Sequence, residues 1–518
     1  MGCSEEESFS LSLLTADERP DCASPVSASA LATGRYTLRI TFMRRGEAPA
    51  AISEKELRDY TLVCDRAITR GQDVDLLVDR SAGTRMTVRV EAFDGTRLVY
   101  TGQREDVDIA GPEVELLMRP AAKASCAAPA PRLHVFHSAT LLPNGQVLLV
   151  GGLAEAASGG DNLAGKLEAF AHGGVDLYDP NSGRFIRVVG PTLAPRVFHR
   201  ALLMPSPAAG PYRVLLVGGI TPSAADKPAV RIKVAVGAFA PLALPFNISP
   251  HETAVAAPAE LLTITPGTNA DDSPTISSTP LPSLPKGMFA AVAHDVAGGR
   301  AMFAPGAGTY TATANANGVT VTGFASASTP PAAQWIALPA GGQPAATQSV
   351  PMARTRVGHE LVRLSGGQMF AFGGQMHGQA PAATESLARS DGSGAFVDAT
   401  PPGQTDHTAW HVFTELGQTD MQRAGGQDAQ VALWVGGFKL DTGDTDNYRI
   451  ADIVTANPVI NVVAGSTPPQ LFAAGAPAGF SPAGYQAAVR LSRPTRQNAP
   501  AWPSGRCAPA RAATDRRP

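Results

Sequence analysis

A repeated segment constrains the fold of this chain more than any other feature of its sequence. The clearest copies read HVFHSATLLPNGQVLLVGG at 134–152, RVFHRALLMPSPAAGPYRVLLVGG at 196–219 and RVGHELVRLSGGQMFAFGG at 356–374. Each copy has an apolar segment, a polar turn, a second apolar segment and a pair of glycines. Short apolar runs between turns are typical of strands buried on both faces. The repeats therefore predict an array of β-units in which each unit adds its own layer of core.

Further copies keep this frame with more divergence. Residues 286–308 read KGMFAAVAHDVAGGRAMFAPGAG, and we interpret Phe289 as standing where the other copies have a histidine. A fifth copy runs from about Thr408 to the VALWVGG that ends at Gly437, and AGYQAAVRL at 483–491 has the form of a sixth opening. The sequence thus predicts about six units, and it leaves open whether the last one is complete.

The segment after the first glycine pair carries a family resemblance. It reads VDLYDPNSGRF at 175–185, so Tyr178 and Phe185 lie seven residues apart across a turn sequence. This arrangement resembles the kelch motif, in which a glycine pair is followed by a Tyr and then by an aromatic residue, for which the family prefers Trp. The resemblance covers residues 132–491 and implies an all-β fold, a kelch-type β-propeller of about six blades. His137 and His199 are 62 residues apart, which exceeds the roughly 50 of a kelch unit and predicts long loops.

We interpret the constant residues of the repeat as structural. The histidines begin the inner strands, where a hydrogen-bonding side chain can tie one blade to the next, and the arginines three residues earlier make structural hydrogen bonds or ion pairs. Glycine allows the chain to bend sharply after the second strand. Ligand binding by the ring of histidines stays open as the alternative. The repeat residues are His137, Gly151, Gly152, Tyr178, Phe185, Arg196, His199, Gly218, Gly219, Arg356, His359, Gly373, Gly374, Gly436 and Gly437.

A second domain precedes the repeats. YTLRITF at 36–42 and MTVRVEA at 86–92 alternate apolar and polar residues, as half-buried strands do. Residues 34–119 therefore predict a small antiparallel sandwich, which resembles the immunoglobulin-like accessory domains of bacterial surface proteins. Residues 120–131, mostly Ala and Pro, are expected to be a linker. Residues 492–518 form an irregular Arg/Pro/Ala-rich tail, so the sequence leaves open whether this C-terminus is authentic.

The bulk composition bears on partners. With 42 basic and 45 acidic residues the net charge is −3, so no whole-chain field favours nucleic acid or an anionic membrane. No run approaches the roughly 18 apolar residues that a membrane helix needs. Membrane association is therefore expected only through a lipid anchor.

The N-terminus supplies such an anchor as a hypothesis. Gly2-Cys3-Ser4, followed by an acidic, serine-rich stretch, resembles the segment after the lipobox of a bacterial lipoprotein. The resemblance implies lipidation of Cys3, an export signal upstream of the given sequence, a flexible tether over residues 1–33 and a location in the cell envelope or outside the cell. A chance Gly-Cys pair is the alternative. The other four cysteines, at 22, 64, 126 and 507, allow two disulfides in three connectivities.

Catalytic and metal-binding interpretations have little support in the sequence. Copper radical oxidases resembling galactose oxidase share kelch-like propellers and need two His, two Tyr and a Cys, but these cysteines lie outside the strong repeats. His407 and His411 are four residues apart, which on an inner strand separates them by about 13 Å. We therefore predict no catalytic residue, no metal and no cofactor.

These observations favour a non-catalytic binding or scaffold protein of the bacterial cell envelope. We expect it to be a monomer and not an enzyme, and to recognise a protein or glycan through propeller loops. Two alternatives stay open: a copper radical oxidase-like or glycan-processing propeller enzyme, and a purely structural envelope protein.

Overall fold

The computed structural model describes part of the chain. The described residues are 6–15, 36–44, 51–60, 76–79, 85–108, 113–121, 131–132, 134, 136–155, 166–180, 183–206, 210–222, 231–235, 242–243, 247–248, 254–267, 273–295, 299–315, 318–326, 331–353, 355–363, 369–374, 385–387, 394–398, 408–409, 412–417, 429–435, 438–440, 449–453, 459–463 and 470–472. Every regular element among them is a β-strand. None of these residues lies in a helix long and apolar enough to cross a membrane.

Five sheets of four antiparallel strands make up the main body, and each follows the repeat of the sequence. We number them blades 1 to 5 and give their strands from the innermost outward. Blade 1 has β8 (Ser138–Leu141), β9 (Val147–Val150), β12 (Val175–Asp179) and β13 (Arg184–Ile186); blade 2 has β14 (Arg200–Leu203), β15 (Tyr212–Val217), β21 (Ala259–Thr265) and β22 (Thr275–Leu281). Blade 3 has β23 (Ala291–Asp295), β24 (Arg300–Ala304), β27 (Ala332–Ala337) and β28 (Ala345–Pro351); blade 4 has β29 (Glu360–Arg363), β30 (Met369–Phe372), β31 (Glu385–Leu387) and β32 (Phe396–Asp398). Blade 5 has β34 (Val412–Gly417), β35 (Ala429–Val435), β38 (Val459–Val463) and β39 (Gln470–Phe472).

The innermost strands follow one another around a common axis. β8 contacts β14, β14 contacts β23, β23 contacts β29 and β29 contacts β34. The apolar faces of successive blades form the core: Leu148 and Leu177 of blade 1 pack with Val214 of blade 2, and Phe303 of blade 3 packs against blade 2. This arrangement of small, face-packed sheets is a β-propeller, so the all-β propeller that the repeats predict is confirmed. The sixth opening at 483–491 lies outside the described residues.

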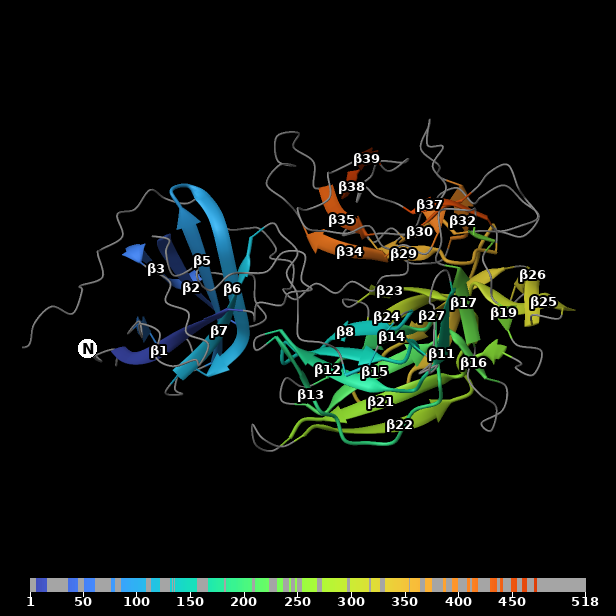
Figure 1. The fold of residues 1–518 in the computed structure, drawn as a ribbon, viewed down its shortest axis with the longest axis horizontal. Helices are drawn as coiled ribbons and strands as arrows, with labels where there is room; N and C mark the ends of the chain where they lie inside the picture. The colour runs from blue at the N-terminus through green and yellow to red at the C-terminus, as the bar shows by residue number, and fades with distance from the viewer. Residues whose placement is uncertain are drawn as a thin grey trace, which may run out of the picture.

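Segments inserted after the glycine pairs form extra sheets between blades. One joins β10 (Leu153–Glu155), β11 (Lys166–Ala171) and β17 (Arg231–Ala235), and a short one joins β16 (Ile220–Pro222) and β20 (Ala254–Ala256). A third joins β19 (Asn247–Ile248), β26 (Gly318–Ser326) and β25 (Ala307–Asn315), and a fourth joins β18 (Leu242–Ala243), β37 (Arg449–Ile453), β36 (Phe438–Leu440) and β33 (Thr408–Ala409). Each of these sheets contains strands from segments that connect the second strand of a blade to its third strand. These connections lie at the same end of every blade, so the extra sheets gather at one end of the propeller (Figure 1).

The N-terminal region forms a sheet of seven strands in the order β3-β2-β5-β6-β7-β1-β4. The strands are β1 (Glu6–Thr15), β2 (Tyr36–Arg44), β3 (Ala51–Tyr60), β4 (Leu76–Asp79), β5 (Arg85–Asp94), β6 (Arg97–Asp108) and β7 (Glu113–Pro120). Residues 6–15, which we expected to lie in a tether, are strand β1, which pairs antiparallel with β4 and then parallel with β7. The alternating apolar residues Leu38, Ile40, Val88 and Val90 are fully buried. The immunoglobulin-like arrangement of this domain stays a prediction.

A polar contact joins the two regions. Arg119 on β7 donates hydrogen bonds to the Tyr178 hydroxyl (3.1 Å) and to the Pro180 carbonyl (2.8 Å). Both acceptors belong to the outer hairpin of blade 1, whose turn lies at the opposite end of the blade from the cross-blade sheets. The N-terminal sheet therefore lies beside blade 1, away from the inserted strands (Figure 1).

Candidate functional site

A left-handed residue precedes the inner strand in four blades. Phe136, Phe198, Phe289 and Gly358 have φ values of 58°, 58°, 55° and 72°. A bulky residue in this region is strained. The shared conformation corrects the sequence alignment of the third copy, since Phe289 corresponds to the phenylalanines of blades 1 and 2, and Ala290 takes the position of the histidine. The sequence alignment of this copy was displaced by one residue. An apolar segment follows in either alignment, so the sequence did not distinguish them.

The three phenylalanines form a row across blades 1 to 3. The ring centroids of Phe136 and Phe198 are 4.3 Å apart, and those of Phe198 and Phe289 are 4.9 Å apart. The Phe198 amide also donates to the Phe136 carbonyl at 3.0 Å. All three side chains are buried. This row therefore ties the starts of neighbouring inner strands together and ends at Gly358.

The repeat histidines lie where the inner strands begin. His199 Nε2 and Ser138 Oγ form a hydrogen bond of 2.8 Å that links blade 2 to blade 1. Burial, with a further contribution from Arg196, lowers the pKa of His199 well below its ordinary value. Burial and His134 lower the pKa of His137 to about 4. Both imidazoles are therefore neutral at neutral pH, and His359 occupies the same buried position in blade 4.

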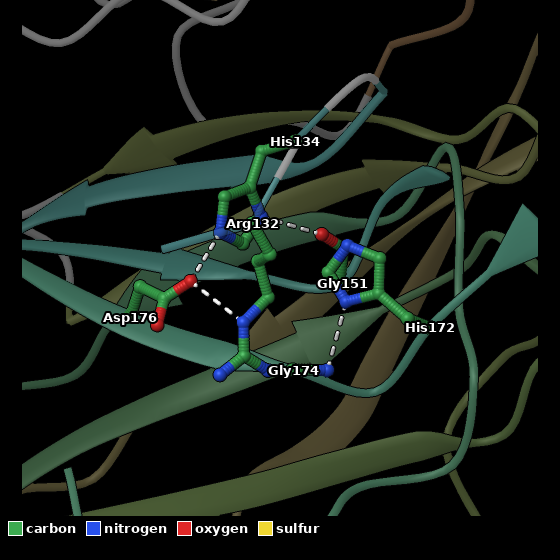
Figure 2. Close-up of polar contacts among 6 residues, drawn as sticks. All are labelled: Arg132, His134, Gly151, His172, Gly174 and Asp176. Atoms are coloured by element: carbon green, nitrogen blue, oxygen red, sulfur yellow. Dashed lines mark hydrogen bonds and ion pairs between the residues drawn. The ribbon is translucent and has the colours of Figure 1, made fainter. Parts of the chain in front are cut away.

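Three residues earlier, blades 1, 2 and 4 carry a basic side chain that binds its own sheet. In blade 1 this residue is His134, whose Nδ1 lies 2.8 Å from the Gly151 carbonyl and whose Nε2 lies 2.6 Å from Asp176 Oδ2 (Figure 2). Arg132 Nε also contacts Asp176 Oδ2, at 3.0 Å. In Figure 2 the neighbouring His172 Nδ1 accepts from the Gly174 amide at 3.0 Å. These contacts satisfy polar groups within blade 1.

Arg196 has the equivalent role in blade 2. Its Nη2 donates to the Pro258 carbonyl (2.7 Å) and to Glu260 Oε1 (2.9 Å), and Ser278 donates to the other carboxylate oxygen at 3.0 Å. The Arg196 side chain is 2% exposed. In blade 4, Arg356 Nη1 donates to the Gly373 carbonyl at 2.5 Å. These arginines hold the third strand or the glycine turn of their own blade.

The glycine pairs turn the chain away from the second strand. Gly151, Gly152, Gly218, Gly219, Gly373 and Gly374 all have positive φ. A Cβ atom at Gly219 would lie 2.6 Å from the Val197 carbonyl oxygen and 2.8 Å from His199 Cβ. Here the turn passes too close to the start of the inner strand for any side chain. In the outer hairpin of blade 1, Tyr178 and Phe185 pair across strands with ring centroids 5.2 Å apart.

The residue after each histidine position faces a neighbouring blade, and here the blades differ. This position holds Ser138, Arg200, Ala291 and Glu360 in blades 1 to 4. Arg200 Nε donates to the Ala290 carbonyl at 3.1 Å, and its Nη2 forms an ion pair with Glu360 Oε1. The two charged residues are 160 positions apart in the sequence and two blades apart in the propeller. The small Ala291 of blade 3 lets the arginine reach past it, so one cation and one carboxyl meet between the inner strands.

Arg200 and Glu360, which we call the axial pair, differ in burial, and burial changes the pKa of the glutamate. The Arg200 side chain is 31% exposed and that of Glu360 is 8% exposed. Burial raises the pKa of Glu360 to about 7, although Arg200 acts in the opposite direction. The carboxyl group can therefore both donate and accept a proton near neutral pH. Buried titratable groups of this kind are candidates for functional sites.

The axial pair lies at the end of the propeller that carries the inserted strands. The first residue of an inner strand pairs with the last residue of the second strand, as Arg200 does with Val217 and Glu360 with Phe372. The insertions follow these second strands directly. The constant residues of the repeat do not reveal this pair. The signal was at the position after the repeat histidine, where the charge of the side chain changes from blade to blade while the neighbouring residues stay similar.

Several sequence-based expectations lie outside the described residues: Cys3, Gly436, Gly437, His407 and His411. Within the described part of the chain, no group of three or more His, Cys, Asp or Glu side chains could hold a metal ion.

Comparisons with known proteins give structural matches only. No protein-family model matches the chain, and no curated protein sequence does. A solved structure of YjhT matches at 11% identity with a TM-score of 0.39, covering 74% of this chain and 94% of that one. A fungal alcohol oxidase of the AA5 family, in complex with copper, matches at 13% identity with a TM-score of 0.30, covering 75% of this chain and 83% of that one.

The second match corrects one expectation. We predicted that the chain is not an enzyme because its sequence shows no catalytic apparatus. An alcohol oxidase is among the structures that match. The prediction that the chain is not an enzyme is therefore wrong.

Proposed function

We propose that the chain is a propeller enzyme that transfers protons to and from a small carbohydrate at the axial pair. The observation that carries this proposal is the meeting of Arg200 and Glu360 between the inner strands. In this proposal Glu360 is the general acid or base, and Arg200 stabilises the negative charge that develops on a substrate oxygen. Acid–base catalysis by one positioned group contributes about 10²–10⁴-fold to a rate.

The electrostatics of the site support this assignment of roles. The Glu360 pKa of about 7 makes both protonation states available near neutral pH. The Arg200 side chain is partly exposed, so a ligand can reach its guanidinium. His199 precedes Arg200 in the sequence, and its neutral imidazole is hydrogen-bonded to the hydroxyl of Ser138 on blade 1. They add hydrogen-bonding groups without further charge.

The position of the site supports a small polar substrate. Cross-blade sheets surround this end of the propeller, and ligand sites are preferentially built where loops on a rigid scaffold converge. A carbohydrate offers hydroxyl and carbonyl oxygens to a guanidinium, and the opening and closing of its ring needs only proton transfer. This proposal adopts the glycan-processing alternative from the sequence.

We also propose the finer assignments that the sequence suggests. These are a kelch-type propeller, lipidation of Cys3, and action as a monomer in the cell envelope on a glycan ligand. The glycine pairs, Tyr178 and Phe185 support the first, and Gly2-Cys3-Ser4 supports the second. Mass spectrometry of the native protein tests the anchor, since an unmodified Cys3 contradicts it.

The test uses a panel of reducing hexoses, N-acetylhexosamines and uronic acids in deuterated water. NMR follows both the interconversion of α and β anomers and the exchange of carbon-bound hydrogen. We expect at least one sugar to react faster with the protein, and Glu360→Gln to reduce that rate by about 10²–10⁴-fold. Asp94→Asn, which changes an exposed carboxylate on a turn, is the matched control. Failure of every sugar to react, or full activity of Glu360→Gln, contradicts the proposal.

A further inference from the structure

The contacts of Arg200 leave part of its guanidinium available. Nε is held by the Ala290 carbonyl and Nη2 by Glu360. Nη1 makes no hydrogen bond within the described part of the chain, and the side chain is 31% exposed. The bond to Ala290 does not depend on Glu360, so the planar group stays oriented when Glu360 leaves it. A guanidinium fixed in this way presents two parallel donors, which is the geometry that a carboxylate accepts.

Among the side chains that the structure describes, those next to the axial pair carry no competing charge. On the side of blade 3 the neighbours are Ala290 and Ala291, which are buried and cannot ionise. On blade 2, His199 precedes Arg200 in the chain and is neutral because burial lowers its pKa. His359, which precedes Glu360, is also buried. Arg200 is the charged group that acts on Glu360.

We infer that the ligand of the axial site carries a carboxylate, which replaces Glu360 on the guanidinium of Arg200 while Glu360 takes up a proton. This inference rests on the proposed function and names the substrate class of the same site. The charges balance: the pair Arg⁺/Glu⁻ plus ligand carboxylate and one proton gives Arg⁺/ligand carboxylate plus neutral Glu360. No covalent bond other than the O–H bond of Glu360 forms.

Burial makes this exchange favourable for the protein. A carboxylate at 8% exposure that loses its cationic partner is costly as an ion, and protonation removes that cost. The ligand therefore binds with proton uptake at a pH above the Glu360 pKa, and without it at a pH well below. Binding weakens as the pH rises, since more free energy is then needed to protonate Glu360.

The experiment is isothermal titration calorimetry of the full chain with D-glucuronate, D-glucose and acetate. Glucuronate and glucose differ at one carbon, which is a carboxylate in the first, and acetate reports the carboxylate alone. Each titration is made above and below neutral pH in two buffers of different ionisation enthalpy, which gives the number of protons taken up. We expect glucuronate to bind more tightly than glucose, with uptake approaching one proton per ligand above neutral pH.

Variants separate the parts of this inference. Arg200→Met removes the preference for glucuronate, on the order of tenfold or more. Glu360→Gln retains glucuronate binding and loses the proton uptake, and Arg213→Gln, an exposed arginine elsewhere on the propeller, changes neither. Equal binding of glucose and glucuronate, no binding of any carboxylate, or an unchanged preference in Arg200→Met overturns the inference. The proposed function fails by a different result, which is an unchanged proton-transfer rate in Glu360→Gln.

Discussion

Arg196 and Arg200 lie four residues apart at the start of blade 2, and each pairs with a glutamate from a distant strand. Arg196 is 2% exposed, and its partner Glu260 belongs to the same blade. The Pro258 carbonyl and the Ser278 hydroxyl complete that network. Arg200 is 31% exposed and reaches across blade 3 to Glu360 of blade 4. The same two residue types therefore occur in a closed network within one blade and in an open pair between blades.

This difference shows that the position of a residue in the repeat distinguishes structural residues from candidate functional ones. The position of Arg196 is basic in blades 1, 2 and 4, where His134 and Arg356 also bind their own blade. The position of Arg200 holds a different residue type in each of blades 1 to 4. A polar side chain that recurs from blade to blade stabilises its own blade. A charged side chain that occurs at its position in only two of blades 1 to 4 is available to bind a ligand.

The largest expected effect is on stability, from Arg196→Met. The substitution leaves the Glu260 carboxylate buried without its cation, which costs about 3–5 kcal/mol. Urea unfolding at neutral pH measures the loss. The double variant Arg196→Met/Glu260→Leu is expected to recover most of it, because an apolar pair leaves no buried charge. A single variant within about 1 kcal/mol of the parent contradicts the structural role.

The next effect is the pH dependence of stability that Glu360 contributes. Its pKa is raised from 4.5 to about 7, so the folded state holds the proton more tightly than the unfolded state does. Stability from this group is therefore full below pH 4.5, is lost as the pH rises to about 7, and changes no further above it. The loss is on the order of 3 kcal/mol. Unfolding curves of the parent and Glu360→Gln across this range should converge at low pH; parallel curves contradict the raised pKa.

The smallest effect is expected at Arg213, an arginine of blade 2 that lies on the surface. It donates to the carbonyls of Pro339 (3.2 Å) and Ala340 (3.1 Å) on blade 3, and these bonds are exposed. Water can replace them, so Arg213→Gln should change the free energy of unfolding by no more than about 0.5 kcal/mol. A loss comparable to that of Arg196→Met in the same urea experiment would show that burial does not distinguish these arginines.

The fold could be predicted from the repeat because each blade must bury its inner strands and then bend. These needs appear in the sequence as apolar runs and glycine pairs, such as Gly218-Gly219. Strand β1 could not be predicted in the same way, since its pairing with β4 and β7 depends on partners more than 60 residues away. The register of the third copy also needed the backbone, because only the positive φ of Phe289 decides between two adjacent alignments.

The candidate site could be predicted less well than the fold. The constant histidines and arginines attracted attention because they recur, and the structure places His199 and Arg196 in contacts that join or hold blades. Arg200 and Glu360 meet only because the propeller brings blades 2 and 4 to one axis and blade 3 has an alanine between them. Sequence distance hides such a pair, whereas a comparison of the same column across the blades would have found it.

The most direct test of the account is the protonation of Glu360 itself. Infrared difference spectra of protein labelled with ¹³C-glutamate, compared with Glu360→Gln, isolate the carboxyl band of this residue as the pH changes. We expect conversion from carboxyl to carboxylate at a pKa of about 7, because burial outweighs the opposing effect of Arg200. Titration near the ordinary value of 4.5 would contradict the central claim that the axial pair is poised for proton transfer.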